Sequence, residues 1–526
     1  MAKRYDAIIV GGGHNGLVAA AYLARAGREV LVLEQRHIVG GATVTEELHP
    51  GFKYSVFSYV VSLLRPEIMR DLSLARHGLE ILPLESTFTP LPGGDYLLRG
   101  PDHAQTHREI YRHSPRDADV YDEYGRLMAQ MAMAVRPILG MVPPDPAAPG
   151  WRDLQSLAQL GAHVRALGGE RFHALAKLMT MSAADFLDEW FECEPLKATM
   201  SASGIIGTFL GPRSPGSAYV LLHHYMGEID GAFRAWGFAR GGTGAISSAI
   251  ASSARSFGAE IRTNAPVQQV ITKNGRATGV VLESGEEIYA RVVASSLDPK
   301  RTFLKLCAAA DLPADFRQAI ERFKIRGSSG KVNLSLAALP NFTSLPGAGM
   351  HLRGSISISP SMDYLEQAFD DAKYGEFSRH PYMDVLIPSL IAPGMAPPGQ
   401  HVMSCFVQYA PYNLKGGWTD AQRTAFGDTV VNTLCEYAPN LRENILHRQV
   451  LSPADIEAVT GLTEGNIFQG ELALNQLFFL RPVPGWAQYR TPVRALYQCG
   501  SGTHPGGGIC GAPGRLAALE MLRDGL

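Results

Sequence analysis

Three glycines and one carboxylate in the first 34 residues have the types and spacing of a phosphate-binding turn. Gly11, Gly13 and Gly16 follow the pattern G-x-G-x-x-G, and Glu34 lies 18 positions after the last of them. In this pattern the first glycine permits a tight turn, the second lets the backbone approach a pyrophosphate, and the third lets a helix pack closely on a strand. The N–H groups at the helix N-terminus then face the phosphates, and the acid can accept hydrogen bonds from a ribose diol.

The elements around this motif are the ones it needs. Residues 5–10 are a short apolar run typical of a strand, residues 17–26 are typical of a helix that Gly27 ends, and residues 29–33 are a second apolar run that leads into Glu34. A glycine-rich turn in an ordinary βαβ unit is the alternative, but the complete order of elements favours dinucleotide binding. Because position 34 carries an acid and no arginine, we expect an unphosphorylated ribose, and therefore FAD or NAD before NADP.

A second glycine pair distinguishes FAD from NAD. Gly40 and Gly41 follow the acid closely, which resembles the two-part FAD fingerprint of glutathione-reductase-type flavoproteins. In those proteins the backbone of the second pair lies against the flavin side of the cofactor, whereas an NAD dehydrogenase has no need of it. The residues expected to contact FAD in this part of the chain are Gly11, Gly13, His14, Asn15, Gly16, Glu34, Gln35, Gly40, Gly41, Ala42 and Thr43.

The composition excludes several classes of protein. With 526 residues the chain is expected to form two or more domains. A net charge of −2 without a block of like charges argues against nucleic acid as a partner, because phosphate binding needs clustered Lys and Arg. The six cysteines are scattered, form no C-x-x-C and begin only at Cys193, so we expect no disulfide framework, no metal site and no redox cysteine pair.

The distribution of apolar residues predicts the cellular location. The apolar stretch near the N-terminus runs directly into the glycine loop, so it is interpreted as the first strand and not as a signal peptide. No uninterrupted apolar run reaches the length of about 18 residues that indicates a transmembrane helix. We expect a cytoplasmic protein that is not secreted, and contact with a membrane surface and assembly into an oligomer are left open.

An alternating set of aromatic residues follows the second glycine pair. Phe52, Tyr54, Phe57 and Tyr59 are spaced as on one face of a strand. Packing in a hydrophobic core is favoured for this face, and the wall of a binding site is the alternative.

The part from about 117 to 210 is expected to be mostly helical, with helices over 119–141, 151–167 and 170–191. Methionines are frequent here, and such flexible side chains could line a tunnel for a long apolar substrate, although ordinary core packing is favoured. These methionines are Met128, Met131, Met133, Met141, Met179 and Met181.

A second block has the pattern of a nucleotide-binding domain. The sequence RGGTG at 240–244 precedes a helix over 245–257, a strand over 261–264, a β-meander over 267–290 with Asn-Gly and Ser-Gly turns, and a buried strand over 291–295. Two of these strands are expected to join the parallel sheet. A second nucleotide loop would require a strand directly before the glycines at 241 and 242, and no clear strand precedes them. These glycines are therefore interpreted as a turn near the flavin.

The last 32 residues contain another glycine-rich loop. A strand is expected over 495–499, a loop over 500–511, and a helix over 512–523 with Pro513 in its first turn. The loop is too long, and is followed by too little chain, for a second dinucleotide site. We expect it to wrap around the cofactor, with the positive helix end able to stabilise a reduced, anionic flavin. The residues expected to contact FAD outside the N-terminal part are Val267, Gly500, Gly502, Gly508, Ile509 and Gly511.

Four motifs together, at 11–17, 40–43, 240–244 and 500–511, resemble the bacterial phytoene desaturase superfamily. The resemblance is strongest to its carotenoid-ketolase-like branch and to the pyridine nucleotide-disulphide oxidoreductase domain-containing proteins. It implies an α/β fold in which a glutathione-reductase-type FAD-binding Rossmann domain carries an inserted mixed α+β substrate domain. It also implies non-covalent FAD and apolar, often polyene, carotenoid or isoprenoid substrates at a membrane surface. The expected FAD-binding segments are 1–70, 232–302 and 490–526, and the expected substrate-binding segments are 71–231 and 303–489.

The chemistry that follows is hydride transfer to flavin N5, with substrate held close and water excluded. An acid or base can assist but is not obligatory. His504 is the candidate for that role, although a structural role is favoured for it; His223 and His224 are weaker candidates, and Cys510 could be imagined as a covalent flavin attachment. Since no second nucleotide domain is visible, O₂ or a quinone is the expected electron acceptor, with a transient NAD(P) at the same site left open.

We therefore expect an FAD-dependent oxidoreductase that desaturates, isomerises or oxygenates a long apolar substrate. An amine-oxidase-type flavoprotein is the first alternative, although the aromatic cage that it requires cannot be located from the sequence. A protein with the FAD fold that acts mainly as an interaction or assembly partner, with little turnover, is the second.

Overall fold

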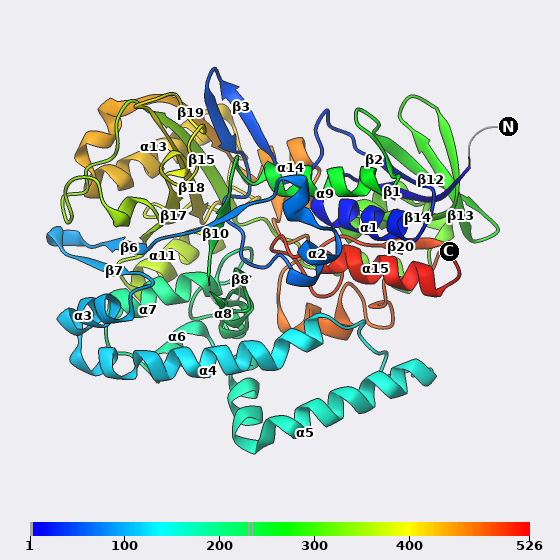
Figure 1. The fold of residues 1–526 in the computed structure, drawn as a ribbon, viewed down its shortest axis with the longest axis horizontal. Coiled ribbons are helices and arrows are strands. Elements are labelled where there is room, and N and C mark those ends of the chain that lie inside the picture. Colours follow the sequence, from blue (N-terminus) through cyan, green and yellow to red (C-terminus); the bar gives the residue numbers. More distant parts are fainter. Residues whose placement is uncertain (1–3, 230–231, 234) are drawn as a thin grey trace.

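The structure is a computed structural model in which residues 4–229, 232–233 and 235–526 are described; residues 230 and 231, at the end of the segment expected to span 71–231, lie outside this part. Two seven-stranded sheets form the centre of the molecule, and helices cover both of them. Figure 1 shows the two sheets side by side, with helices α3 to α8 along one edge. Among the described residues, no helix is long and apolar enough to cross a membrane.

The first sheet contains a parallel part built from distant segments of the chain. The order of its strands is β11 (Glu260–Arg262), β2 (Val30–Leu33), β1 (Tyr5–Val10), β14 (Glu287–Ser295) and β20 (Leu496–Gln498). Strands β1, β2 and β20 are almost entirely buried, as expected for parallel strands covered on both faces, whereas the edge strand β11 is not. All four pairings are parallel, so the predicted return of two strands to the parallel sheet is confirmed.

The predicted β-meander is also confirmed, with one correction. Strands β12 (Val267–Lys273) and β13 (Arg276–Leu282) pair antiparallel with each other, and β13 pairs with the first half of β14. The separate strands expected over 287–290 and 291–295 are one continuous strand. Its first half belongs to the meander and its second half to the parallel sheet, so a change of partner, not a turn, marks the boundary.

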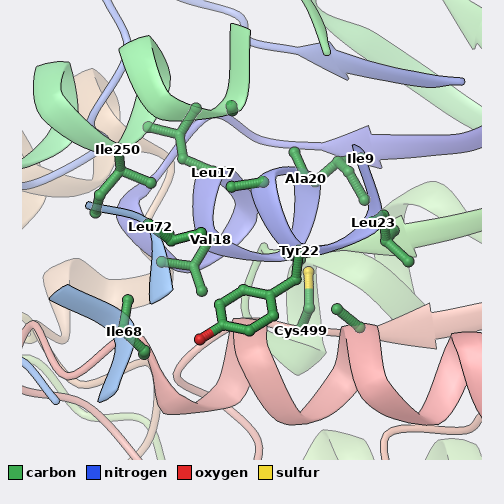
Figure 2. Packing of buried hydrophobic residues seen from close by; sticks show 14 of the residues in the cluster. Ile9, Leu17, Val18, Ala20, Tyr22, Leu23, Ile68, Leu72, Ile250 and Cys499 are labelled. Carbon is green, nitrogen blue, oxygen red and sulfur yellow. The ribbon is translucent and has the colours of Figure 1, made fainter. Parts of the chain in front are cut away.

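Three helices pack together on the parallel part of the sheet. They are α1 (His14–Arg25), α9 (Gly244–Ser256) and α15 (Ala512–Arg523), and the predicted C-terminal strand and helix agree with β20 and α15. Figure 2 shows side chains of α1, among them Leu17, Val18 and Tyr22, packed among residues from other segments. A Cβ atom on Gly514 would clash with the carbonyl oxygen of Asn15, so a glycine is needed where the first turns of α1 and α15 meet.

The second sheet is mixed and has the order β19, β15, β18, β17, β16, β6 and β7. All of its pairings are antiparallel except that of β16 with β6. Strand β15 is buried along its whole length, including its lysine, Lys331. The bounds are Ile445–Leu451, Ser329–Leu336, His401–Gln408, Tyr382–Leu386, Ser355–Ile358, Thr87–Pro90 and Tyr96–Arg99, in the order of the sheet.

The helical part differs from the prediction in its boundaries. The helix expected over 119–141 is α4 (Pro115–Leu139); it starts earlier because the hydroxyl of Ser114 caps it by accepting the N–H of Asp117. The predicted break near 168 is a local one, since Gly168 has φ +77° within α5. The helices of this part are α3 (His103–His113), α4, α5 (Trp151–Thr180), α6 (Ala183–Asp188), α7 (Glu194–Ser201) and α8 (Ser217–Tyr225), so the helix predicted over 170–191 is the end of α5 followed by α6.

Short hairpins and helices complete the fold. The two-stranded pairings are β3 (Thr45–His49) with β4 (Phe52–Ser55), β5 (Ile81–Pro83) with β10 (Gly237–Ala239), and β8 (Glu228–Ile229) with β9 (Ala232–Phe233). The remaining α-helices are α2 (Pro66–Asp71), α10 (Ala314–Arg322), α11 (Met362–Lys373), α12 (Pro388–Ile391), α13 (Asp420–Tyr437) and α14 (Pro453–Thr460).

Candidate functional site

The first glycine loop has the geometry that its residue types predicted. Strand β1 ends at Val10, Gly11 follows with φ +91°, and α1 begins at His14. Only glycine adopts the conformation of Gly11 without strain. A Cβ atom on Gly16 would clash with the carbonyl oxygen of Gly11, so this glycine permits the close contact of helix and turn.

Gly13 faces open space at the N-terminus of α1. Its φ of −67° is accessible to any residue, and an added Cβ atom would meet no heavy atom within 4 Å. No side chain caps α1, and no acid lies in its first turn. The N–H groups and the partial positive charge of the helix end are therefore directed at open space, as the binding of a pyrophosphate requires.

Glu34 is held beside this loop. Its Oε2 accepts a hydrogen bond of 2.8 Å from the N–H of Gly12, and its Oε1 accepts one of 2.9 Å from the N–H of Arg36. Burial raises the pKa of the Glu34 carboxyl. Each carboxylate oxygen retains a lone pair, so the group can still accept from ribose hydroxyls. The neighbouring Gln35 is exposed.

The second glycine pair lies against the first loop. The N–H of Gly40 donates to the carbonyl oxygen of Gly12 at 2.8 Å, and Gly13 and Gly40 form an isolated β-bridge. With φ +128°, Gly40 has a conformation that favours glycine, and a Cβ atom there would also clash with the carbonyl of Thr43. The two halves of the predicted FAD fingerprint are therefore adjacent in space.

The C-terminal loop closes the same site. Asn15 Nδ2 donates to Ser501 Oγ at 2.9 Å, which joins the first loop to the last one. Added Cβ atoms on Gly500 and Gly502 would clash with the segment 296–299. These two glycines, predicted to contact the cofactor, thus have an evident role in close packing of the loop on the sheet.

Further along this loop, the backbone reaches a cavity that we call cavity 1. Gly508, with φ +110°, and Ile509 line it, and Gly511 caps α15 with φ +72°. Ile509 has φ +55°, a left-handed conformation that costs a β-branched residue about 1–3 kcal/mol. The fold thus retains a strained residue at the wall of the cavity.

Arg481 holds the C-terminal loop in place. Its side chain is fully buried and donates hydrogen bonds to six backbone carbonyl oxygens. Burial lowers its pKa to about 10, so the guanidinium remains charged at neutral pH. The six acceptors are the carbonyls of Phe468, Gly470, Glu471, Gln476, Ser501 and Thr503.

Cavity 1 lies where these motifs meet the second sheet. Three predicted FAD contacts of the N-terminal part, His14, Ala42 and Thr43, line one side of it. Aromatic and aliphatic side chains form most of the remaining wall, and no aspartate or glutamate lines it among the described residues. The aromatic members of the wall are Phe57, Tyr59, Trp236, Phe406 and Phe468.

The sequence prediction missed Lys331, which is the strongest candidate for chemistry in cavity 1. It lies in β15 with 1% of its surface exposed, and its Nζ has no hydrogen-bond partner and lies 4.7 Å from the ring centroid of Tyr59. Burial lowers the pKa of Lys331 to about 7. The amine can therefore accept or release a proton near neutral pH. The sequence around it, SGKVNLSL, carries no local sign that this lysine is buried.

Of the predicted site residues, His14, Ala42, Thr43, Gly508 and Ile509 line cavity 1, whereas the acid-base candidate His504 and the predicted contact Val267 do not. His504 is buried with its Nε2 3.1 Å from the carbonyl oxygen of Ile138, and it is not among the lining residues. Burial lowers its pKa to about 4, so the ring is neutral at pH 7, and the contact indicates a structural role. Val267 is half-buried at the start of β12, also outside the cavity.

The weaker candidates, His223 and His224, each have a ring nitrogen close to a backbone carbonyl oxygen and aromatic rings beside them. His224 lines cavity 1 between Trp236 and Phe468, with stacked rings on both sides, and its Nδ1 lies 2.9 Å from the carbonyl oxygen of Val220. Burial lowers the pKa of His224 to about 4 and that of His223 to about 3. Both rings are therefore neutral at physiological pH, so they act through packing and not through charge.

The alternating aromatic residues divide between two roles. Strand β4 includes Phe52 and Tyr54, which pack in the core as favoured, but it ends at Ser55. Phe57 and Tyr59 lie beyond the strand; they belong to the same core cluster and also line cavity 1. None of the six methionines of the helical part lines the cavity; Met128 and Met131 are buried in the core as favoured, whereas Met133 is exposed.

A larger cavity, cavity 2, adjoins cavity 1. It has a volume of about 520 Å³ and extends to the start of α3 at His103. Its lining is more polar than that of cavity 1 and includes Arg99, Tyr121 and Asp384. The residues that line both cavities are Val60, Ile206, His224 and Trp236.

Comparison with known proteins agrees with this geometry. Residues 16–518 match the family described as flavin containing amine oxidoreductase. Pyridine nucleotide-disulfide oxidoreductase domain-containing protein 2 of Rattus norvegicus is 43% identical over 99% of this chain and 94% of its own. Phytoene desaturase (lycopene-forming) of Pseudescherichia vulneris is 25% identical over 98% of this chain and 99% of its own. The solved structure of a putrescine oxidase triple mutant has a TM-score of 0.62 with 18% identity, covering 99% of each chain.

These matches confirm the superfamily that the four glycine motifs indicated, and an α/β FAD-binding fold. The open space before Gly13, the lone pairs of Glu34 and the adjacent second glycine pair fit an FAD molecule at this site. The protein is an oxidoreductase with FAD as its cofactor. The chain belongs to the flavin-containing amine oxidoreductase family.

Proposed function

We propose that this FAD-dependent oxidoreductase removes two hydrogens from a long apolar chain of the carotenoid, polyene or isoprenoid type. The observation that carries the proposal is the wall of cavity 1, which is apolar except for small polar groups, neutral histidines and the amine of Lys331. Such a wall favours an uncharged hydrocarbon segment by burial of apolar surface. The phytoene desaturase relative, which acts on an isoprenoid by its name, supports the same substrate class.

The proposed fold detail is the glutathione-reductase-type arrangement, with the expected FAD-binding and substrate-binding segments. It is supported by the parallel sheet that segments 5–33, 260–295 and 496–498 build together. The cofactor is proposed to be non-covalent. Burial raises the pKa of the Cys510 thiol, and this residue does not line cavity 1, so a thiolate attachment has no support.

The chemistry divides between cofactor and protein. Bound FAD supplies the hydride acceptor. Lys331 Nζ, neutral in part at pH 7, accepts the proton from the neighbouring carbon, so that the substrate loses one hydride and one proton and gains a double bond. Phe57, Tyr59 and Phe406 exclude water from the reacting segment. We propose O₂ or a quinone as the electron acceptor.

An amine substrate is the alternative suggested by the family description and by the fold of putrescine oxidase. The rings of Tyr59 and Phe406 are stacked with centroids 5.4 Å apart, so this pair leaves no gap for a C–N bond between them. The protonated fraction of Lys331 would also repel a substrate ammonium, and no aspartate or glutamate among the described residues lines cavity 1 to attract one. Both observations favour the hydrocarbon.

The test is the mass of the product. Incubation of the flavin-loaded protein with a C20 to C40 polyene and a quinone is expected to yield a product lighter by two hydrogens. Lys331→Met should retain the flavin and lower turnover by about 100-fold or more, since loss of a general base has effects of this size. Oxidation of an amine panel without any change of the polyene would overturn the proposal.

A further inference from the structure

Cavity 2 contains a buried arginine that lacks a carboxylate partner. Arg99 ends strand β7, lines cavity 2 and has 8% of its surface exposed. Its Nη1 donates a hydrogen bond of 3.3 Å to the hydroxyl of Tyr121, and its Nε has no partner. No aspartate or glutamate among the described residues forms an ion pair with it.

Burial of a guanidinium without an acidic partner is unfavourable in free energy unless a ligand forms hydrogen bonds with its free donors. Arginine does not lose its proton in proteins, so Arg99 carries its charge inside the cavity. Buried charges in proteins are normally paired or bind a ligand, because desolvation without a partner is unfavourable. Nη1 is bound to Tyr121 and the buried Nε has no partner, so the guanidinium keeps donors that an anion in the cavity would satisfy.

The acids that line cavity 2 are already bound elsewhere. Asp384 accepts a hydrogen bond of 2.7 Å from the hydroxyl of Tyr59 and another from Ser355. Glu85 forms an ion pair with Arg353 at 2.6 Å. Neither carboxylate forms an ion pair with Arg99.

The position of Arg99 fits one end of a substrate that reaches cavity 1. The two cavities share four lining residues, among them Val60 and Trp236, and are therefore adjacent. An amphiphile could place its hydrocarbon against the apolar wall of cavity 1 and its polar end in cavity 2. No aspartate or glutamate among the described residues lines cavity 1, so its wall does not repel the hydrocarbon part of an anionic amphiphile.

We propose that Arg99 binds a carboxylate at one end of the substrate, which makes the substrate class a long-chain or isoprenoid acid. This inference rests on the proposed oxidation of an apolar chain. Among the described residues, Arg99 is the one lysine or arginine that lines cavity 2. A single guanidinium matches a carboxylate in charge and in its two-pronged geometry, whereas a diphosphate would require further cations.

The test uses the flavin-loaded protein and two C15 isoprenoids, farnesoic acid and farnesol, which differ only at the polar end. Isothermal titration calorimetry at pH 8 is expected to show the acid bound at least about tenfold more tightly, the size of one charge-assisted contact. Arg99→Met should abolish this preference, and Arg99→Lys should retain part of it. Arg108→Met is the matched control. Arg108 lies in α3 and is exposed, and its substitution removes the same charge from the protein.

The outcomes separate the two proposals. Equal affinity for acid and alcohol in the wild type, or a preference that Arg99→Met retains, would overturn the role of Arg99. If farnesol still binds and bleaches the flavin in that case, the proposed oxidation stands without the carboxylate site. If neither compound binds, both proposals are wrong. An unchanged flavin spectrum shows that a variant is folded. If Arg99→Met does not fold, the affinities of Arg99→Lys for acid and alcohol decide whether Arg99 binds the carboxylate.

Discussion

The side-chain amide of Asn15 donates a 2.9 Å hydrogen bond to the hydroxyl of Ser501, across 486 positions of the sequence. Asn15 lies in the first turn of α1, and Ser501 lies in the loop between β20 and α15. The bond joins the two glycine-rich loops, and Gly514 packs against the backbone of Asn15 on the same side. The candidate FAD site is therefore assembled from the two ends of the chain.

Gly13 and Gly16 should respond differently to substitution. Gly13→Val places a side chain in open space at a compatible φ, so the unfolding free energy of the cofactor-free protein should change by about 1 kcal/mol or less. The side chain would occupy the space of the pyrophosphate, and flavin should be absent from the purified protein. Gly16→Ala should destabilise the fold itself by about 1–3 kcal/mol, because its Cβ clashes with Gly11.

The measurements are the 450 nm absorbance of the purified variants and denaturant unfolding without added FAD. Gly161→Ala is the control, since Gly161 lies in α5 with open space around it. Yellow Gly13→Val protein with normal FAD content would contradict the position assigned to the pyrophosphate.

Lys331 predicts a specific pH dependence of stability. Its folded pKa of about 7 lies below the ordinary value for lysine, so between pH 7 and about 10 the unfolded chain binds a proton that the folded chain does not. Relative to Lys331→Met, the wild type should gain about 1.4 kcal/mol of unfolding free energy per pH unit in this range. Below pH 7 the destabilisation is complete and the difference between the two proteins should be constant.

Urea unfolding of both proteins at several values between pH 6 and 10 gives this difference directly. Other titrating groups are common to both proteins and cancel. A difference that does not vary with pH would show that the pKa of the Lys331 amine is not lowered in the folded state.

Arg481 should be needed for both stability and flavin retention. Arg481→Met leaves six carbonyl oxygens without their donor, and we expect a loss of at least about 3 kcal/mol together with loss of FAD. Arg494→Met is the comparison, because Arg494 is exposed and donates to a single carbonyl, that of Asn274. Its effect should stay within about 0.5 kcal/mol. Equal losses in thermal unfolding of the two variants would be inconsistent with the assigned role.

Val60 lies where the two cavities meet, so a large side chain there should obstruct long substrates. Val60→Trp is expected to retain the flavin and its reduction by dithionite, and to weaken binding of a C20 polyene by about tenfold or more. A C5 fragment of the same chemistry should bind as before. Val459→Trp, at an exposed site, is the control in these titrations. Equal weakening of both ligands would mean that substrate does not pass between the cavities.

The parts of the site that the sequence predicted are those defined by local chemistry. The strand, glycine loop and helix over residues 5–25 follow from glycine spacing and apolar periodicity, and the same holds for β20 and α15. Both glycine motifs were expected to contact FAD, and the β-bridge of Gly13 with Gly40 shows that they lie side by side.

The cavity walls could not be predicted in this way. Lys331, Phe406 and Phe468 are brought together by tertiary packing of segments that have no local mark of a site. Arg481 resembles a surface arginine in the sequence, because its partners are backbone carbonyls that carry no sequence signal. Phe57 and Tyr59 continue an aromatic alternation that belongs to the core, and only the end of β4 separates their role from that of Phe52.

The most direct test of the account is the anaerobic visible spectrum of the flavin-loaded protein during titration with a long polyene and, separately, with primary and secondary amines. The account predicts that the polyene bleaches the flavin band near 450 nm and that the amines leave it unchanged. Bleaching by an amine alone would contradict the proposed substrate and assign cavity 1 to C–N oxidation.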